Sequence, residues 1–146
     1  MSPVAALDNS NFNTFERMKQ IIVEGSQMTD IPAFYKEINR VFMSEEDWTL
    51  GPSLDAFNDL LYGGYGILQE DPQVTLVWKD YQKSKEALGY LETQKYYQAK
   101  LAPGSPFDKA RFQQQLKDLN AGVGKTYFDL LMEIIKAHPN IRLVRA

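Results

Sequence analysis

Three short runs rich in β-branched residues constrain the fold of this chain more than any other feature of its sequence. The runs are residues 19–25, 74–78 and 141–145, and segments with helical periodicity separate each run from the next. Strands that alternate with helices in this way form a parallel sheet joined by right-handed crossovers. We therefore predict an α/β fold with a small three-stranded parallel sheet packed with helices.

The segments between the strands carry recognisable helix starts. Asp30 is expected to cap a helix that has Pro32 in its first turn. A second helix follows Ser53, and its apolar side is expected to hold Leu54, Phe57, Leu60 and Leu61 before Gly63 and Gly64 end it. Asp80 is expected to cap a third helix that runs through Leu88. Further helices are predicted from Tyr90 to Leu101, from Ser105 to about Leu119, and from a capping box at Thr126 and Asp129.

The order of these patterns also suggests how the chain is organised. Residues 1–18 are polar and irregular, so we interpret them as an N-terminal extension. Residues 19–146 contain all three predicted strands and form one domain. Residues 89–125 interrupt the strand and helix order, and we interpret them as a helical insertion.

Composition excludes several classes of function. The chain has 146 residues, no cysteine and one histidine, which excludes disulfides, thiolate sites, cysteine nucleophiles and multi-histidine metal sites. We predict no cofactor and no metal. A net charge of −3 argues against a general nucleic-acid binder. No apolar run has the roughly 18–20 residues of a membrane span, and no secretory signal is visible, so we predict a cytoplasmic protein without a membrane partner.

The negative charge is concentrated in one quarter of the sequence. Residues 44–80 contain eight acidic residues and one basic residue, Lys79, while the rest of the chain is mildly basic. Such asymmetry can steer a basic partner toward the acidic region. A solvated loop with incidental acidic residues explains the same pattern equally well.

Two acidic residues of this region are the most informative. Asp55 and Asp59 lie four residues apart on the predicted second helix, opposite its apolar side, so both carboxylates face solvent. Asp55 complements the helix dipole, whereas Asp59 gains nothing from its position and stands four residues from a like charge. Neither has a basic neighbour three or four residues away. This unrelieved acidic face is a plausible anion mimic for a basic pocket.

Other candidate sites are weaker. Residues 120–126 end like a phosphate-binding loop, but Leu119 occupies the required glycine position and no strand precedes it. His138 lies at a helix end, where it can contact the last carbonyl groups, and no serine or cysteine constellation accompanies it. A carboxylate pair for acid–base catalysis needs a cleft, which the open side of a short helix does not offer. We favour binding over catalysis and predict no catalytic residue.

The ordered set of these segments resembles the barstar family of ribonuclease inhibitors. The resemblance begins at residues 21–25 and Ile31-Pro32, is strongest at residues 54–61, and continues through residues 76–78 and the final helix and strand. Residues 54–61 are similar to the recognition helix of the family. The resemblance covers about residues 19–88 and 126–146, which leaves the extension and the insertion outside it.

The resemblance implies roles for particular residues. Asp55 and Asp59 would be the central inhibitory acids, with Asp59 in the pocket that a nuclease uses for an RNA phosphate. Glu133 matches a further acidic contact, and Gly63 matches a glycine at the end of the recognition helix. Three positions depart from the family: Asn58 replaces an aromatic residue, and Thr49 and Leu50 replace paired tyrosines, with Trp48 just before them. We include Asn58, Thr49 and Leu50 among the partner-binding positions.

The implied function is a one-to-one inhibitor that blocks the active site of a basic, extracellular-type ribonuclease and so protects the cell that makes it. The departures remove aromatic contact area and leave open whether barnase itself is bound, but the anion-mimic chemistry remains. An alternative is a barstar-like interaction module for a basic partner that is not a ribonuclease, since a fold does not fix a function. Trp48 and Tyr62 could lie at the rim of such an interface or in the core.

Overall fold

A computed structural model describes residues 18–146, so all but the last residue of the predicted N-terminal extension lies outside the described part. The sheet contains β1 (Lys19–Glu24), β2 (Val74–Lys79) and β3 (Ile141–Arg145). The order is β1-β2-β3, and both pairs of neighbouring strands are parallel. The predicted three-stranded parallel sheet is therefore confirmed, with the strand order in space following the order along the chain.

The two faces of the sheet differ in burial. Ile21, Leu76 and Leu143 occupy one row of the register and point to the face that forms the core. On the opposite face, Ile22 pairs with Val77 and is 41% exposed. The helices thus bury one side of the sheet much more completely than the other.

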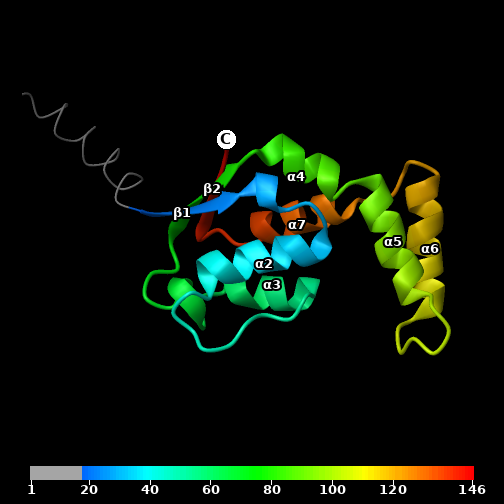
Figure 1. The fold of residues 1–146 in the computed structure, drawn as a ribbon, viewed down its shortest axis with the longest axis horizontal. Helices are drawn as coiled ribbons and strands as arrows, with labels where there is room; N and C mark the ends of the chain where they lie inside the picture. The colour runs from blue at the N-terminus through cyan, green and yellow to red at the C-terminus, as the bar shows by residue number, and fades with distance from the viewer. Residues whose placement is uncertain (1–17) are drawn as a thin grey trace, which may run out of the picture.

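Six α-helices accompany the sheet in the described part of the chain (Figure 1). They are α2 (Ile31–Phe42), α3 (Leu54–Leu61), α4 (Tyr81–Ala87), α5 (Tyr90–Lys100), α6 (Lys109–Asn120) and α7 (Tyr127–Lys136). Short 3₁₀ turns, η1 (Gly25–Gln27) and η2 (Gly66–Leu68), follow β1 and α3. The elements outside α5 and α6 form what we call the body, and α5 with α6 forms the hairpin.

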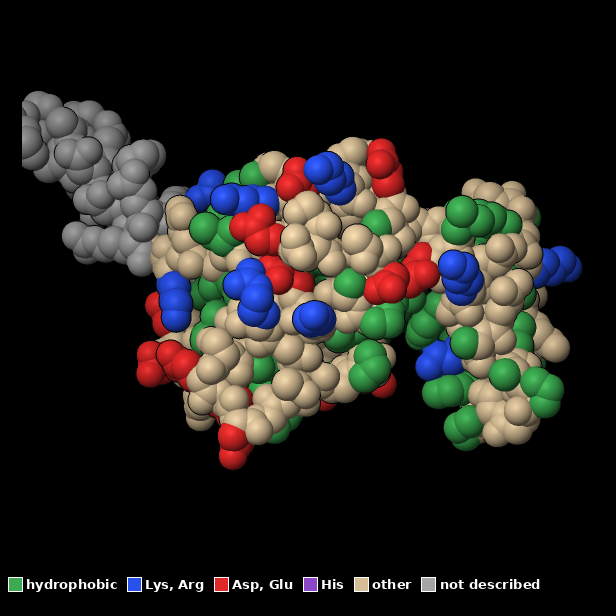
Figure 2. All heavy atoms as spheres, in the orientation of Figure 1, with side chains coloured by type: hydrophobic (Ala, Val, Ile, Leu, Met, Phe, Trp, Pro, Cys, Tyr) green, Lys and Arg blue, Asp and Glu red, His purple; other side chains and the backbone are tan. Residues whose placement is uncertain are grey.

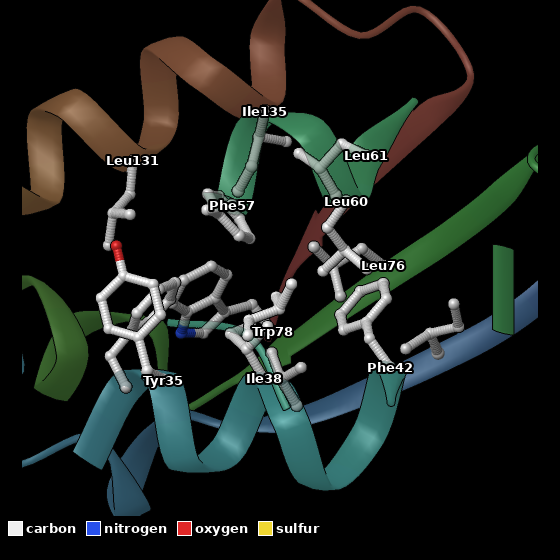
Figure 3. Close-up of a cluster of buried hydrophobic side chains, with 14 of the residues drawn as sticks. Tyr35, Ile38, Phe42, Phe57, Leu60, Leu61, Leu76, Trp78, Leu131 and Ile135 are labelled. Carbon is white, nitrogen blue, oxygen red and sulfur yellow. The ribbon is translucent and has the colours of Figure 1, made fainter. Parts of the chain in front are cut away.

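One core holds the body together (Figure 3). Side chains from α2, α3, α7 and β2 converge there, and Phe34 of α2 contacts Phe57 edge-on at a centroid distance of 5.3 Å. Phe34 also stacks on Trp78 at 6.1 Å. The Trp78 indole donates a hydrogen bond of 2.9 Å to Ser84 Oγ, so the largest buried ring has its polar atom satisfied. Burying these rings fixes α3 against the sheet.

One buried charge also stabilises the body. Glu37 of α2 is buried, and burial works against its charge, but hydrogen bonds from Arg40 and from the backbone N–H of Glu24 lower the pKa of its carboxyl below the ordinary value. The Glu24 N–H to Glu37 Oε2 distance is 2.7 Å. This carboxylate therefore ties the end of β1 to α2.

The hairpin has a small core of its own and is fixed to the body at two helix starts. The buried hydrophobic residues of this core are Tyr97, Phe112 and Leu119. Glu92 accepts a 2.7 Å hydrogen bond from the N–H of Ile31 at the start of α2, and Thr93 Oγ1 accepts one of 2.7 Å from the N–H of Tyr127 at the start of α7. These contacts satisfy N–H groups that a helix start leaves without partners.

Most predicted helix boundaries are confirmed, but the predicted start at Ser105 and the predicted capping role of Asp80 are wrong. Asp30 caps α2, and Thr126 with Asp129 forms the capping box of α7. Asp80 stands at the N-cap of α4, but its φ of 51° is left-handed rather than extended and its side chain caps nothing. Helix α6 begins at Lys109, after the capping residue Asp108, and not at Ser105, whose hydroxyl accepts from the N–H of Phe107 in a local turn.

Candidate partner-binding face

Helix α3 presents the two predicted acids on its exposed side. Ser53 caps the helix by accepting a hydrogen bond of 3.1 Å from the N–H of Ala56. Phe57, Leu60 and Leu61 are buried, so the opposite side, which carries Asp55 and Asp59, faces solvent. No described residue forms a salt bridge with either carboxylate. The pair of negative charges is therefore open to a partner.

The end of α3 is held by the turn before β3. Asn140 Nδ2 donates to the carbonyl of Leu61 at 3.0 Å and to the carbonyl of Pro72 at 2.8 Å. Gly63 follows with a φ of +86°, and a Cβ at this position would lie 3.1 Å from Pro72 Cβ. Gly63 thus has a structural reason to be glycine. Both ends of α3 are fixed, which holds the acids in place.

Asn58 lies between the two acids in sequence and points toward α7. Its Oδ1 is 2.7 Å from Nε2 of His138, a buried ring that also contacts the exposed Tyr62 edge-on at a centroid distance of 4.5 Å. Burial lowers the pKa of His138 below its ordinary value and favours the neutral ring. His138 therefore orients the Asn58 carboxamide. The predicted contact residue Asn58 is half-buried and already engaged on its Oδ1 side.

A groove between α3 and α7 brings a third acid beside the pair. The groove has a volume of about 340 Å³, with Asp55 and Asn58 on the α3 side and Glu133 on the α7 side. Leu54, Leu130, Ile134 and Ala137 form its floor and walls. Glu133 is paired with Lys125, whose Nζ lies 2.5 Å from Glu133 Oε1. The groove thus offers two carboxylates on opposite walls, one of which already has a cation.

The negative charges of Asp59 and Asp55 contribute to raised pKa values of two nearby tyrosines. Burial and, in smaller part, the charge of Asp59 raise the pKa of Tyr65. Burial and then Asp55 raise the pKa of Tyr96 in the hairpin, while Arg111 works against them. Asp59 therefore acts on the loop after α3, and Asp55 acts on the hairpin.

In the loop before α3, the structure differs from our prediction that Leu50 is a partner-binding position. Leu50 is 6% exposed, and its backbone N–H and carbonyl both bond to the Asn39 side chain. Its side chain is therefore withdrawn from the exposed face, and it anchors the loop instead. Thr49 is exposed. Trp48, which we left open between rim and core, is 44% exposed and contacts the Tyr65 ring at 4.9 Å.

The acidic and histidine side chains of the described residues do not gather into a metal site. Among residues 18–146, no group of three or more histidine, aspartate and glutamate side chains could hold a metal ion. Arg142 and Arg145 lie on β3 at the edge of the sheet, with Arg145 over the Tyr81 ring at 5.0 Å. No helix in this described range is sufficiently long and apolar to span a bilayer.

Sequence reasoning missed two residues of this face. Lys125 reaches Glu133 from the loop that closes the hairpin, and His138 reaches Asn58 from a position 80 residues away. Neither contact follows from helical spacing. The position of His138 at a helix end before Pro139 was the one available signal, and it pointed to the carbonyl groups of α7 rather than to α3.

These features define a small α/β protein whose parallel sheet positions a short acidic helix at the surface. Comparison with protein families matches residues 18–98 to Barstar (barnase inhibitor). The match spans more than half of the chain, so the protein belongs to the barstar family. It includes α3 with both acids, and it ends within α5, before the rest of the hairpin and Glu133. A search of curated proteins found no match.

Proposed function

We propose that this protein inhibits a ribonuclease by placing α3 in the active site of the enzyme. The observation that carries the proposal is that Asp55 and Asp59 stand exposed, form no ion pair with residues 18–146, and lie on a helix fixed at both ends in a member of the barstar family. A ribonuclease cleft holds RNA phosphates with basic side chains. Carboxylates at the same spacing can accept the same charge-assisted hydrogen bonds.

Each element of the face has a part in this mechanism. Asp59 takes the place of a phosphate at the centre of the cleft, and Asp55 meets a second cation beside it. Glu133 accepts a basic side chain that enters the groove between α3 and α7. The ends of α3 are held by Ser53 and Asn140, so the acids need little ordering when the complex forms, and this lowers the entropic cost of binding.

The charge distribution supports fast association. Residues 44–80 contain eight acidic residues and one basic residue, whereas the rest of the chain is mildly basic, and α3 lies in the middle of this segment. Attraction between this region and a basic enzyme speeds encounter at low salt and weakens as salt is added. In the cell, such an inhibitor would act in the cytoplasm as an immunity protein against a nuclease that the cell exports.

The proposed role is binding and not catalysis. Asp55 and Asp59 stand on an open helix surface rather than in a cleft that excludes water. General acid–base chemistry relies on environments that push the pKa values of two groups apart. An exposed pair of carboxylates is better suited to bind fixed cations.

A module for a basic partner other than a ribonuclease is the second candidate, and two observations favour it. Leu50 is buried, and Asn58 is engaged by His138, so neither position supplies the exposed aromatic area that the family resemblance would place there. The acidic face alone recognises any basic surface of suitable shape.

Inhibition assays on a panel of small ribonucleases, barnase among them, test the proposal. We expect one-to-one inhibition of at least one enzyme, and Asp59→Ala should weaken it by about 30-fold or more, as loss of a central contact does. Glu70→Gln is the matched control, because it removes an exposed acid of the same segment that is not on α3. Inhibition that is absent with every enzyme, or equally sensitive to both variants, would contradict the proposal.

A further inference from the structure

The hairpin stands beside the acidic face without a role in the mechanism above. Figure 2 shows a recess between the hairpin and the body, and the hairpin projects from the body over much of its length. Its attachment is nevertheless firm, because Glu92 and Thr93 bind the starts of α2 and α7, and the Tyr96 ring contacts Tyr127 at 5.0 Å. A partner that docks on α3 therefore meets the hairpin at a fixed position.

A second hollow lies next to the groove between α3 and α7. It has a volume of about 300 Å³ and lies between the hairpin and α7. Its lining residues are Tyr97, Gln115, Asp118, Val123, Gly124, Lys125 and Leu130. Leu130 also lines the groove between α3 and α7, so the two hollows adjoin across this one side chain.

One ion pair crosses the boundary between the hollows. Lys125 lines the second hollow, Glu133 lines the groove, and the two side chains meet at 2.5 Å. Both are more than half exposed. In the free protein, Glu133 is therefore already bound to a cation that the hairpin loop supplies.

The second hollow also contains two oxygen acceptors beside Lys125. Gln115 Oε1 is buried and accepts no hydrogen bond from the described residues, and Asp118 lines the same hollow. Both are acceptors that suit an ammonium group. Beside them, Val123 is 77% exposed and gives the loop an apolar surface turned to solvent.

We propose that residues 121–125 form a second wall of the partner-binding face, and that Lys125 competes with a basic side chain of the partner for Glu133. This inference rests on the proposed function, and the occupant is the same ribonuclease that binds α3. The partner displaces Lys125 toward Gln115 and Asp118, and the surface of the partner then packs against Val123. Enzymes without a basic side chain at this position leave the ion pair intact and gain nothing from Glu133.

Val123→Arg tests the wall. The variant adds bulk and like charge where a basic partner would pack, so we expect binding to the ribonuclease identified above to weaken by about ten-fold or more. Leu91→Arg is the matched control: Leu91 is 69% exposed on the same hairpin, lines neither hollow, and undergoes the same change of size and charge. Equal affinities of the two variants would contradict the proposal that residues 121–125 contact the partner.

Lys125→Gln tests the competition. Removing the internal cation should tighten binding by up to about five-fold, the scale of an exposed ion pair. The gain should vanish in the Glu133→Gln background, because Lys125 acts only through that carboxylate. An unchanged affinity, or the same gain in both backgrounds, would overturn this step.

The experiments distinguish failure of the proposed hairpin role from failure of the proposed inhibitor function. If Asp59→Ala abolishes inhibition while the Val123 and Lys125 variants behave like their controls, the inhibitor mechanism stands and the role of the hairpin is overturned. If the wild-type protein inhibits none of the ribonucleases, both the proposed inhibitor mechanism and the proposed role of residues 121–125 are contradicted.

Discussion

The body and the hairpin are built on different amounts of core. In the body, side chains from both ends of the sequence meet in one cluster around Phe34, Phe57 and Trp78. In the hairpin, the cluster of buried hydrophobic side chains among the described residues consists of Tyr97, Phe112 and Leu119. The body can therefore fix α3 by its own packing, whereas the hairpin depends on its attachment through Glu92 and Thr93. The difference shows that α3 is held by the main core of the protein, whereas the hairpin beside it is joined to the body largely by a few hydrogen bonds.

The largest expected effect separates the two cores. Phe57→Ala empties a fully buried site beneath α3 and should lower the free energy of unfolding of the whole protein by about 3–5 kcal/mol. Phe112→Ala should instead open the hairpin locally, with loss of amide protection in α5 and α6 while β2 stays protected. Urea unfolding and hydrogen exchange measure the two effects. Equal loss of protection in β2 from both variants would show that the cores are not separate.

A smaller effect concerns the bond that joins the regions. Thr93→Val removes the acceptor for the N–H of Tyr127 and leaves a buried donor without a partner, at a cost of about 1–3 kcal/mol. We expect faster exchange of the hairpin amides and of the first turn of α7. Thr93→Ser retains the hydroxyl and serves as the control. If both variants exchange alike, the hydroxyl does not secure the hairpin.

The two regions should also differ in their response to acid. Burial lowers the pKa of His138 from 6.5, so the unfolded chain takes up a proton before the folded protein does. Below pH 6.5 the stability of the body should therefore fall, by at most about 1.4 kcal/mol per pH unit, until the folded histidine also protonates. His138→Gln should remove this dependence.

Urea unfolding and hydrogen exchange at about pH 7 and about pH 5 measure the difference. Because the chain has a single histidine, the comparison with His138→Gln isolates its contribution. Amide protection within the hairpin should change little over this range. A wild-type protein and a variant with the same pH dependence would rule out a contribution from His138.

The smallest expected effect is a gain in stability. Asp55 and Asp59 are like charges four residues apart, so Asp59→Asn should raise the free energy of unfolding by about 0.2–0.5 kcal/mol, and high salt should remove the gain. Glu70→Gln, off the helix, should not show it. Chemical denaturation at low and high salt checks this, and a destabilised Asp59→Asn variant would mean that the carboxylate has an unseen stabilising contact.

Local patterns predicted most of the fold. The three β-branched runs indicated the strands, and the apolar spacing of Phe57, Leu60 and Leu61 indicated both α3 and its buried side. The caps at Asp30 and Thr126 were found because their signals lie within four residues. The prediction that Asp80 caps a helix was wrong because an aspartate also tolerates left-handed backbone, and in this conformation its side chain makes no capping hydrogen bond.

Less of the candidate site could be predicted from the sequence, because the positions of its side chains depend on contacts between residues far apart in the chain. Spacing along one helix placed Asp55 and Asp59 together, but nothing local showed that Leu50 turns inward to meet Asn39. The contact between His138 and Asn58 joins residues that only the tertiary fold brings together. The pairing of Lys125 with Glu133 likewise depends on how the hairpin returns to α7.

The position of the hairpin in the connection from β2 to β3 has a consequence for how this fold can grow. The strands pair in the order of the chain, so the hairpin lengthens a single connection and separates no other pair of neighbouring strands. It roughly doubles the length of that connection, and each doubling of a flexible loop adds only about 0.6 kcal/mol to the entropy cost of closing it. The sheet can therefore accept an additional pair of helices next to α3 without a change of topology.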